Sequence, residues 1–286
     1  WDATDQIPLR AIESGALSRF GAVDTTDGGE SRRYSLSGEW RERGERGGVR
    51  LSAYAMHYEL ELFSNFTYAL DRPEGDQFEQ KDDRNVYGLN AARDWIHPLA
   101  GRNSRTEVGV QLRHDRIRVG LFDTVARTRS TTTREDRVRQ TGLGLYALND
   151  TAWTDWLRSV LGLRADGYWA DVDSTLAANS GSSDDTQLSP KLSLIFGPWA
   201  KTEFFFNAGR GLHSNDARGT TTTIDPKSGD ATDTVPPLVA SKGYEVGART
   251  EIVPGLQSSL ALWKLDIGSE LVYVGDAGTT EPNRAS

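Results

Sequence analysis

The sequence predicts an all-β fold, an antiparallel up-and-down meander that forms part of a transmembrane β-barrel. Apolar and polar residues alternate with a period of two along about ten segments. The connections between these segments alternate between short turns and long polar loops. Tryptophans gather near the short turns, where an amphipathic ring would meet the lipid headgroups.

The alternation is clearest in 188–209, where two apolar-polar runs flank a Gly-Pro turn at 197–198. Alternation bounded by such a turn is typical of a β-hairpin. In chain order, we predict strands at 31–42, 49–70, 82–96, 105–118, 136–149, 157–170, 188–196, 202–209, 242–252 and 256–274. Residues 1–30 are predicted as a loop with a short helix near 9–20.

Most of the strands are predicted from apolar residues that share one face. These residues are Tyr34, Leu36 and Trp40; Tyr87, Leu89, Ala91 and Trp95; Val108, Val110 and Leu112; Leu157, Leu161, Leu163, Ala165 and Trp169; Leu192, Leu194 and Phe196; Phe204 and Phe206; Tyr244, Val246 and Ala248; and Trp263. Only 49–70, which is rich in Tyr, Leu and Phe, and 136–149 are assigned without such a set. We expect these faces to contact lipid.

The opposite face is polar, and in a barrel it would line the lumen. We expect it to carry Glu39, Arg164, Asp166, Glu245 and Arg249. Facing lipid near the midplane, each Arg would cost about 2–4 kcal/mol, which favours the lumen. For any single residue, a solvated sheet face is the alternative interpretation.

The connections differ in length at the two ends of the predicted sheet. Short turns fall at 43–48, 97–104, 150–156, 197–200 and 253–255, and long polar loops at 71–81, 119–135, 171–186 and 213–241. Outer-membrane barrels have this asymmetry, with short periplasmic turns and longer outer loops. A soluble sandwich mixes the two kinds through its Greek-key crossings.

Composition excludes several classes of protein. The chain has no cysteine, and hence neither a disulfide nor a thiolate metal site. Its four histidines lack metal-ligand spacing and no catalytic or phosphate-binding motif occurs, so we predict no enzyme, no metal and no cofactor. The net charge of −8 argues against a nucleic-acid partner. No window approaches the roughly 18 apolar residues of a membrane helix.

One polar cluster, 210–218, follows directly after a predicted strand on the long-loop side. In the functional interpretation, His213, Asn215, Asp216 and Arg218 point into the vestibule and bind a ligand. In the structural interpretation, Asn215 and Asp216 form loop turns and Arg218 pairs with Asp216.

Four strings resemble the barrel domain of TonB-dependent outer-membrane receptors. They are SPKLSLIFGP, NAGRGLHSNDARG, GYEVGAR and ELVYVGDAGTTEP, and the similarity is densest over 188–282. That family forms a plugged barrel of about 22 strands and imports scarce nutrients, most often ferric siderophores. The resemblance implies that 1–286 is a partial barrel domain, with a loop at 1–30, strands and loops over 31–274 and a truncated loop at 275–286.

The resemblance also implies a location and partners. The location is the outer membrane of a Gram-negative-type bacterium, and the partners are outer-membrane lipid and a small-molecule ligand such as a ferric siderophore. The TonB energy-coupling complex would be contacted through an N-terminal region that this sequence does not contain. No string resembles the plug or the C-terminal aromatic strand, so we expect a central-to-late barrel segment.

Three functions remain open at this point. The chain belongs to an active nutrient transporter, to a passive porin-type diffusion channel, or to a soluble all-β binding module. The last of these requires a second sheet to cover the apolar face.

Overall fold

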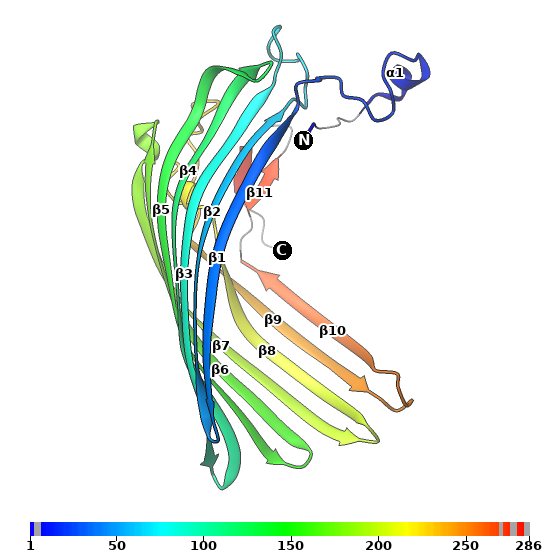
Figure 1. The fold of residues 1–286 in the computed structure, drawn as a ribbon, viewed down its shortest axis with the longest axis vertical. Coiled ribbons are helices and arrows are strands. Elements are labelled where there is room, and N and C mark those ends of the chain that lie inside the picture. Colours follow the sequence, from blue (N-terminus) through cyan, green and yellow to red (C-terminus); the bar gives the residue numbers. More distant parts are fainter. Residues whose placement is uncertain (3–6, 269–270, 275–278, 283–286) are drawn as a thin grey trace.

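The computed structural model describes residues 1–2, 7–268, 271–274 and 279–282, with the backbone alone for the last two segments. Ten strands form one antiparallel sheet in chain order, from β1 to β10, which confirms the predicted meander (Figure 1). Among the described residues, no helix is long and apolar enough to cross a lipid bilayer.

The elements follow one another along the chain, with the longest connection between strands of the main sheet at 215–237. They are α1 (Leu9–Glu13), β1 (Gly28–Gly44), β2 (Gly47–Ser64), β3 (Phe78–Leu99), β4 (Arg102–Val125), β5 (Thr128–Thr154), β6 (Leu157–Ser174), η1 (Ala177–Asn179), β7 (Gly181–Trp199), β8 (Thr202–Ser214), η2 (Ala217–Thr220), β9 (Leu238–Thr250), β10 (Ser258–Ile267), β11 (Leu271–Val274) and β12 (Thr279–Pro282).

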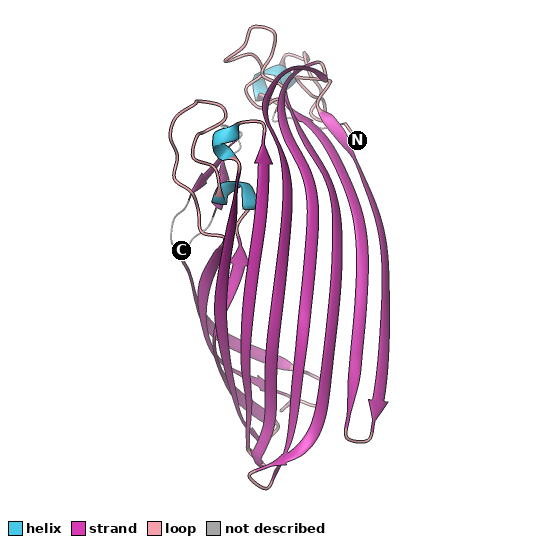
Figure 2. Cartoon of the chain, turned by 90° about the vertical axis from the view of Figure 1, so that its left-hand side faces the viewer, coloured by secondary structure: helices cyan, strands magenta, loops and turns pink. Residues whose placement is uncertain are grey.

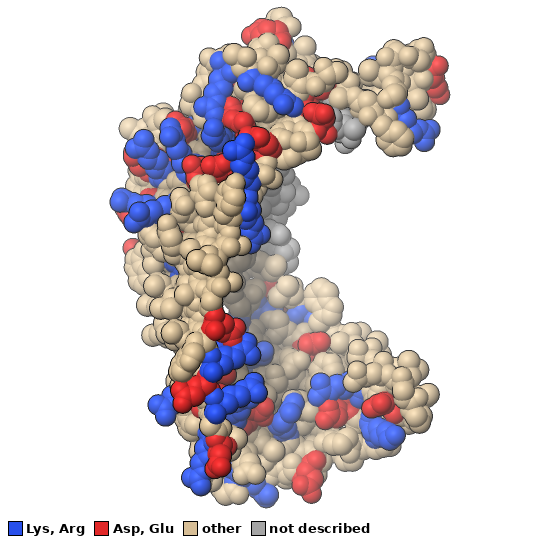
Figure 3. All heavy atoms as spheres, viewed as in Figure 1, with Lys and Arg blue, Asp and Glu red and all other residues tan. Residues whose placement is uncertain are grey.

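Strand register sorts the side chains onto two faces, because residues paired across an antiparallel ladder point the same way. Leu161 of β6 pairs with Leu192 of β7, which pairs with Ala208 of β8. These residues belong to the outer face, where Leu161 is 49% and Phe204 is 47% exposed. No second sheet covers this face among the described residues, as a soluble sandwich would require. Figure 3 shows an uncharged band between charged groups above and below it.

The other face is the concave one, and we call it the lumen face. On it, Arg164 Nη1 of β6 reaches past β5 and donates to Gln111 Oε1 of β4 at 2.6 Å. Gln111 lies in one register row with Glu39 of β1. By the same register, the lumen face carries Glu39, Arg164, Asp166, Glu245 and Arg249.

Two of the predicted long loops are mostly strand. Segment 119–135 extends β4 and β5, which join through Ala126 and Arg127 with φ of 47° and 63°. Segment 171–186 extends β6 and β7 and leaves only 175–180 between them. Polar residues on both faces predict a loop, but strands that rise above the lipid into water also carry them.

Three further expectations were wrong in detail. The N-terminal helix covers only Leu9–Glu13 of the predicted 9–20. The last predicted strand divides, because β10 ends at Ile267 and β11 pairs with β12 in a separate sheet. Trp263 pairs with Glu245 and therefore lies on the lumen face, one residue out of the predicted phase.

β12 replaces part of the closing loop predicted at 275–286, whereas 275–278 and 283–286 lie outside the described residues. A four-residue strand in a polar, glycine-containing segment has little alternation to reveal it.

Aromatic side chains gather at the short-turn end of the sheet. The rings of Trp156 and Trp199 stack with centroids 6.2 Å apart, and Phe204 lies 6.3 Å from Trp199. Trp153 Nε1 donates to Ser159 Oγ at 2.7 Å, so its polar edge is satisfied. Such rings suit a membrane interface, where one edge is apolar and the other wet.

The two faces can be distinguished by cysteine labelling, since the chain has no native cysteine. We expect Leu163→Cys to react with a lipid-soluble maleimide, and Arg164→Cys to react only with a water-soluble one, because neighbouring residues alternate between lipid and lumen. Labelling is read in outer membranes by mass spectrometry, with heat-modifiable migration reporting folding. The reverse labelling pattern would contradict the face assignment.

Candidate ligand site on the lumen face

The connection 215–237 folds down beside the upper ends of the strands (Figure 2). Buried Asn215 closes its base, donating from Nδ2 to Pro236 O at 2.9 Å and from its backbone N to Pro237 O at 3.0 Å. Val235 N donates to Gly219 O at 3.0 Å. Although the connection joins β8 to β9, it lines one cavity together with residues of β2 and β3, so it lies over the lumen side of the sheet.

A single buried side chain, Asn179, anchors the middle of this connection. Its Oδ1 accepts from Thr223 N and Ile224 N at 3.0 Å each, and its Nδ2 donates to Ile224 O at 2.8 Å. The Asn179 carbonyl accepts from Thr221 Oγ1 at 2.8 Å. Asn179 has no exposed surface, so the structure places all these bonds away from solvent competition.

Apolar packing seats η2 against the wall below these anchors. Ala217 of η2 and Leu238 at the start of β9 pack with Val138, Tyr168 and Val172 of β5 and β6. Because η2 sits in this cluster, the residues on either side of Ala217 are held at a fixed height over the lumen face.

Those two residues, Asp216 and Arg218, form a closed ion pair. Asp216 accepts from Arg218 N at 2.9 Å and Nε at 3.0 Å, and its second oxygen accepts from Arg218 Nη2 at 2.6 Å. Burial acts to raise the pKa of Asp216, but the charge and hydrogen bonds of Arg218, together with Arg134, outweigh it and lower the pKa to about 2. The structure therefore contains the pair between Asp216 and Arg218 that the structural interpretation of this segment predicted.

The wall beneath carries charges in the same spacing, since residues two apart in a strand share a face. The pairs are Asp82 and Arg84 on β3, Arg113 and Asp115 on β4, Arg134 and Asp136 on β5, and Arg164 and Asp166 on β6. Buried Asp115 accepts from Arg113 Nε at 2.9 Å and from Gln140 Nε2 at 2.8 Å. Each pair has a net charge of zero, so these eight charged side chains add no net charge to the wall.

A cavity of about 360 Å³ lies between the wall and the connection, and we call it the lumen cavity. It is lined by Leu60, Gln80, Asp82, Val119, Leu121 and Arg134 from the wall, and by Asp216, Arg218, Thr222, Asp225, Lys227, Asp233 and Val235 from the connection. Among the described residues, buried Arg134 Nη2 and Asp136 Oδ1 have no hydrogen-bond partner. Guanidinium donors beside hydroxyl and apolar groups suit an oxygen-rich anionic ligand.

The four residues of the predicted ligand cluster separate in the structure. Asp216 and Arg218 line the lumen cavity, and Asn215 is used in closing the connection. His213 lines neither this cavity nor a second lumen cavity, although its neighbour Leu212 lines the second. Arg134 was missed, although its spacing to Asp136 repeats that of Arg164 and Asp166.

The predicted lumen-facing residues divide between two places. Arg164 and Asp166 line the second lumen cavity, of about 430 Å³, below the apolar cluster. Glu39 pairs with Arg41, Glu245 accepts from Asn207 at 2.9 Å, and Arg249 donates to Glu203 at 2.6 Å. In the part of the chain that the structure describes, no group of three His, Cys, Asp or Glu is placed to hold a metal ion.

Removing the anchor should release the connection. We expect Asn179→Ala to lower the free energy of closing it by about 2 kcal/mol, because Thr223 N and Ile224 N lose their buried acceptor. Limited trypsin digestion at Lys227 measures this as faster cleavage in the folded protein. Asn207→Ala, on the lumen face but outside the connection, is the control; equal cleavage in the two variants would contradict the anchor role.

The ion pair predicts a pH dependence of known sign. Because the pKa of Asp216 is lowered from 3.8 to about 2, its contribution to closing the connection is complete above pH 3.8 and is lost as pH falls towards 2. Hydrogen exchange of amides 218–222, corrected for the intrinsic pH effect, should show constant protection down to about pH 4 and a fall below it. Asp216→Asn should abolish this fall; an unchanged fall would place the titrating group elsewhere.

Among known protein families, the model of a family described as "TonB dependent receptor-like, beta-barrel" matches residues 4–284. The sequence matches no curated protein. The fold is similar to those of many solved structures, and at the low identities of the three described next this similarity shows a shared fold alone.

The ferric citrate transporter FecA in its unliganded form gives a TM-score of 0.71 at 11% identity, over 90% of this chain and 37% of that one. The copper transporter OprC gives 0.69 at 14% identity, over 89% of this chain and 43% of that one. The alcaligin outer-membrane receptor FauA from Bordetella pertussis gives 0.58 at 12% identity, over 91% and 43%. The chain thus spans less than half the length of these solved structures.

The sheet supplies the curved wall, the connection 215–237 folds onto its lumen face, and the family match extends over nearly all of 1–286. On that ground, the chain belongs to the TonB-dependent receptor family, as part of its β-barrel.

Proposed function

We propose that this chain is part of an outer-membrane active transporter that imports a ferric siderophore, captured in the lumen cavity. The observation that carries the proposal is the buried, unpartnered Arg134 Nη2 in a cavity closed by a folded connection. Ferric chelates present clustered, often anionic oxygens, and a guanidinium group binds such oxygens at defined angles. Two of the similar structures are a ferric citrate transporter and an alcaligin receptor, which supports this ligand class.

In this proposal, three partners act on the full-length protein. Outer-membrane lipid surrounds the apolar outer face, the ferric chelate binds on the long-connection side of the lumen, and the TonB energy-coupling complex supplies the energy for release inward. Family membership supports all three.

A passive diffusion channel is the second candidate. The inward fold of 215–237 is as consistent with this channel as with the active transporter, because such a connection could form the narrow part of a pore. The two candidates differ in their energy source. Uptake by the active transporter stops when the proton-motive force is collapsed, whereas diffusion through a channel continues.

Neutralising the wall pair tests the site without leaving an unpaired buried charge. We expect the double variant Arg134→Gln/Asp136→Asn to weaken binding of radiolabelled ferric chelates by about tenfold, because the charged donors of Arg134 are lost. Binding and uptake are measured in cells that express the full-length protein, over a panel of ferric citrate, hydroxamate and catecholate chelates.

The matched control is Arg164→Gln/Asp166→Asn, which removes the same kind of pair from the neighbouring strand, outside the lumen cavity. We expect it to bind like the parent, with both variants showing normal heat-modifiable migration. Equal binding by the parent protein and both double variants would show that Arg134 does not bind the ligand.

A further inference from the structure

Two cations face each other on the outer wall. Arg210 of β8 is the direct cross-strand partner of Lys242 of β9, and both side chains are exposed. They share the outer face with Ala208 and Tyr244, which lie two residues along each strand. Like charges directly opposite one another destabilise a strand pair, so this arrangement calls for an anion between them.

No acidic side chain neutralises this pair within the described residues. Neither Arg210 nor Lys242 makes an ion pair there, and the nearest acid in register, Asp266 of β10, is engaged by Lys264 at 3.1 Å. Arg116 and Arg139 also oppose each other on the outer face, with Asp171 next to Arg139 in register as Asp266 is next to Lys242. Their surroundings differ, because three acids, Asp83, Asp171 and Asp173, line the hollow beside Arg116 and Arg139, whereas no acid of the described chain lines the groove beside Arg210 and Lys242.

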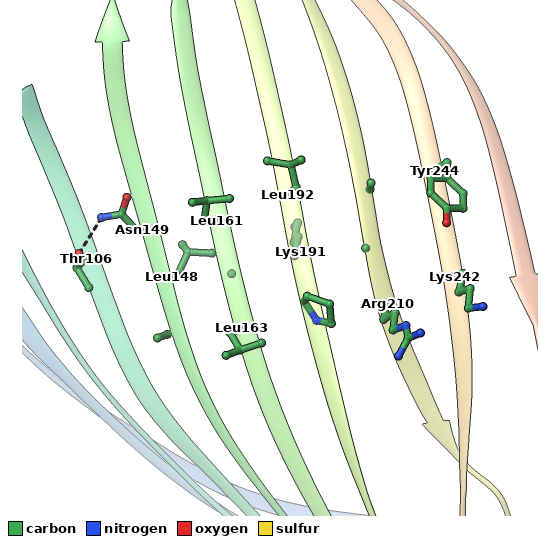
Figure 4. A pocket seen from close by; sticks show the side chains of 15 residues that line it. Thr106, Leu148, Asn149, Leu161, Leu163, Lys191, Leu192, Arg210, Lys242 and Tyr244 are labelled. Carbon is green, nitrogen blue, oxygen red and sulfur yellow. Dashed lines mark hydrogen bonds between the residues drawn. The ribbon is translucent and has the colours of Figure 1, made fainter. Parts of the chain in front are cut away.

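An apolar groove lies beside the two cations on the same wall (Figure 4). It has a volume of about 680 Å³, and its sides include Leu161, Leu163, Pro190, Leu192 and Tyr244. Its floor is low because Gly162, Ala208 and Gly209 have little or no side chain. The paired register of β7 and β8 ends at Lys191 and Gly209, where the groove lies.

The occupant must therefore combine an anionic group with an apolar chain. We infer that Arg210 and Lys242 hold the phosphate of a lipid from the surrounding outer leaflet, and that the groove holds one of its acyl chains. Both cations lie on the long-connection side of the outer residues Phe206, Tyr244 and Val246, and long cationic side chains can reach headgroups from there. A guanidinium binds phosphate oxygens bidentately, and an ammonium adds a point charge.

This inference rests on the outer face being in lipid and not on the imported ligand. If ferric chelates do not bind in the lumen cavity, the lipid site is still expected. If the lipid site is absent, the proposed transport is unaffected.

The test compares two double variants of the full-length protein in nanodiscs that contain phosphatidylglycerol within phosphatidylcholine. We expect Arg210→Gln/Lys242→Gln to retain about tenfold less phosphatidylglycerol, measured by native mass spectrometry after release. The control, Arg116→Gln/Arg139→Gln, removes the same charge from the same face and should retain as much as the parent. Equal retention in the two double variants overturns the inference.

A second arm separates a lipid from free phosphate. Ala208→Trp keeps both cations but fills the groove, and we expect it to lose phosphatidylglycerol as well, while remaining folded by heat-modifiable migration. Millimolar inorganic phosphate should not displace the lipid from the parent protein. Normal retention by Ala208→Trp, or displacement by inorganic phosphate, would show a bare phosphate site and overturn the lipid assignment.

Discussion

The antiparallel hydrogen-bond ladder is the constraint on which the rest of this structure depends. Hydrocarbon offers no partner to backbone N–H and C=O groups, so a wall that crosses it has to pair them all between strands. Pairing in chain order leaves side chains alternating between two environments. Neighbours such as Leu163 and Arg164 thereby lie on opposite faces of the sheet, and no other protein layer covers the outer face among the described residues.

The same period of two organises the charges of the lumen. Because residues i and i+2 share a face, an Arg and an Asp at that spacing neutralise each other without help from another strand, as Arg113 and Asp115 do. Asp216 and Arg218 repeat the spacing in the connection, where the backbone of η2 assists the pair. Two neutral units can approach each other over the cavity without the repulsion that unpaired arginines would cause.

The sequence predicted what alternation controls and missed what depends on contacts across the fold. The ten-strand meander followed from period and turn signals, although Trp263 lies on the opposite face from the one predicted. The turn at Ala126 and Arg127 was missed because neither residue is typical of positive φ; contacts such as Arg127 Nε to Thr26 O, at 2.6 Å, hold it instead. In the candidate site, the pair of Asp216 and Arg218 was foreseeable from local spacing. The role of Asn179 was not, since its partners Thr223 and Ile224 lie in a distant segment. The pairing of Arg134 with Asp136 is local, but its place in the lumen cavity depends on the distant connection 215–237.

The anchors also decide which part of the connection a ligand can rearrange. Asn215 and Asn179 hold its base and residues 221–224 through buried hydrogen bonds, and apolar packing holds η2. A ligand shifts such an equilibrium only by its difference in affinity for the two arrangements. Moving η2 would expose the apolar cluster, whereas moving 225–233 breaks mainly local turn bonds such as Ser228 N to Asp225 Oδ1, at 2.8 Å. Binding in the lumen cavity therefore acts most easily on 225–233 and leaves Asp216 and Arg218 in place as a fixed charged edge.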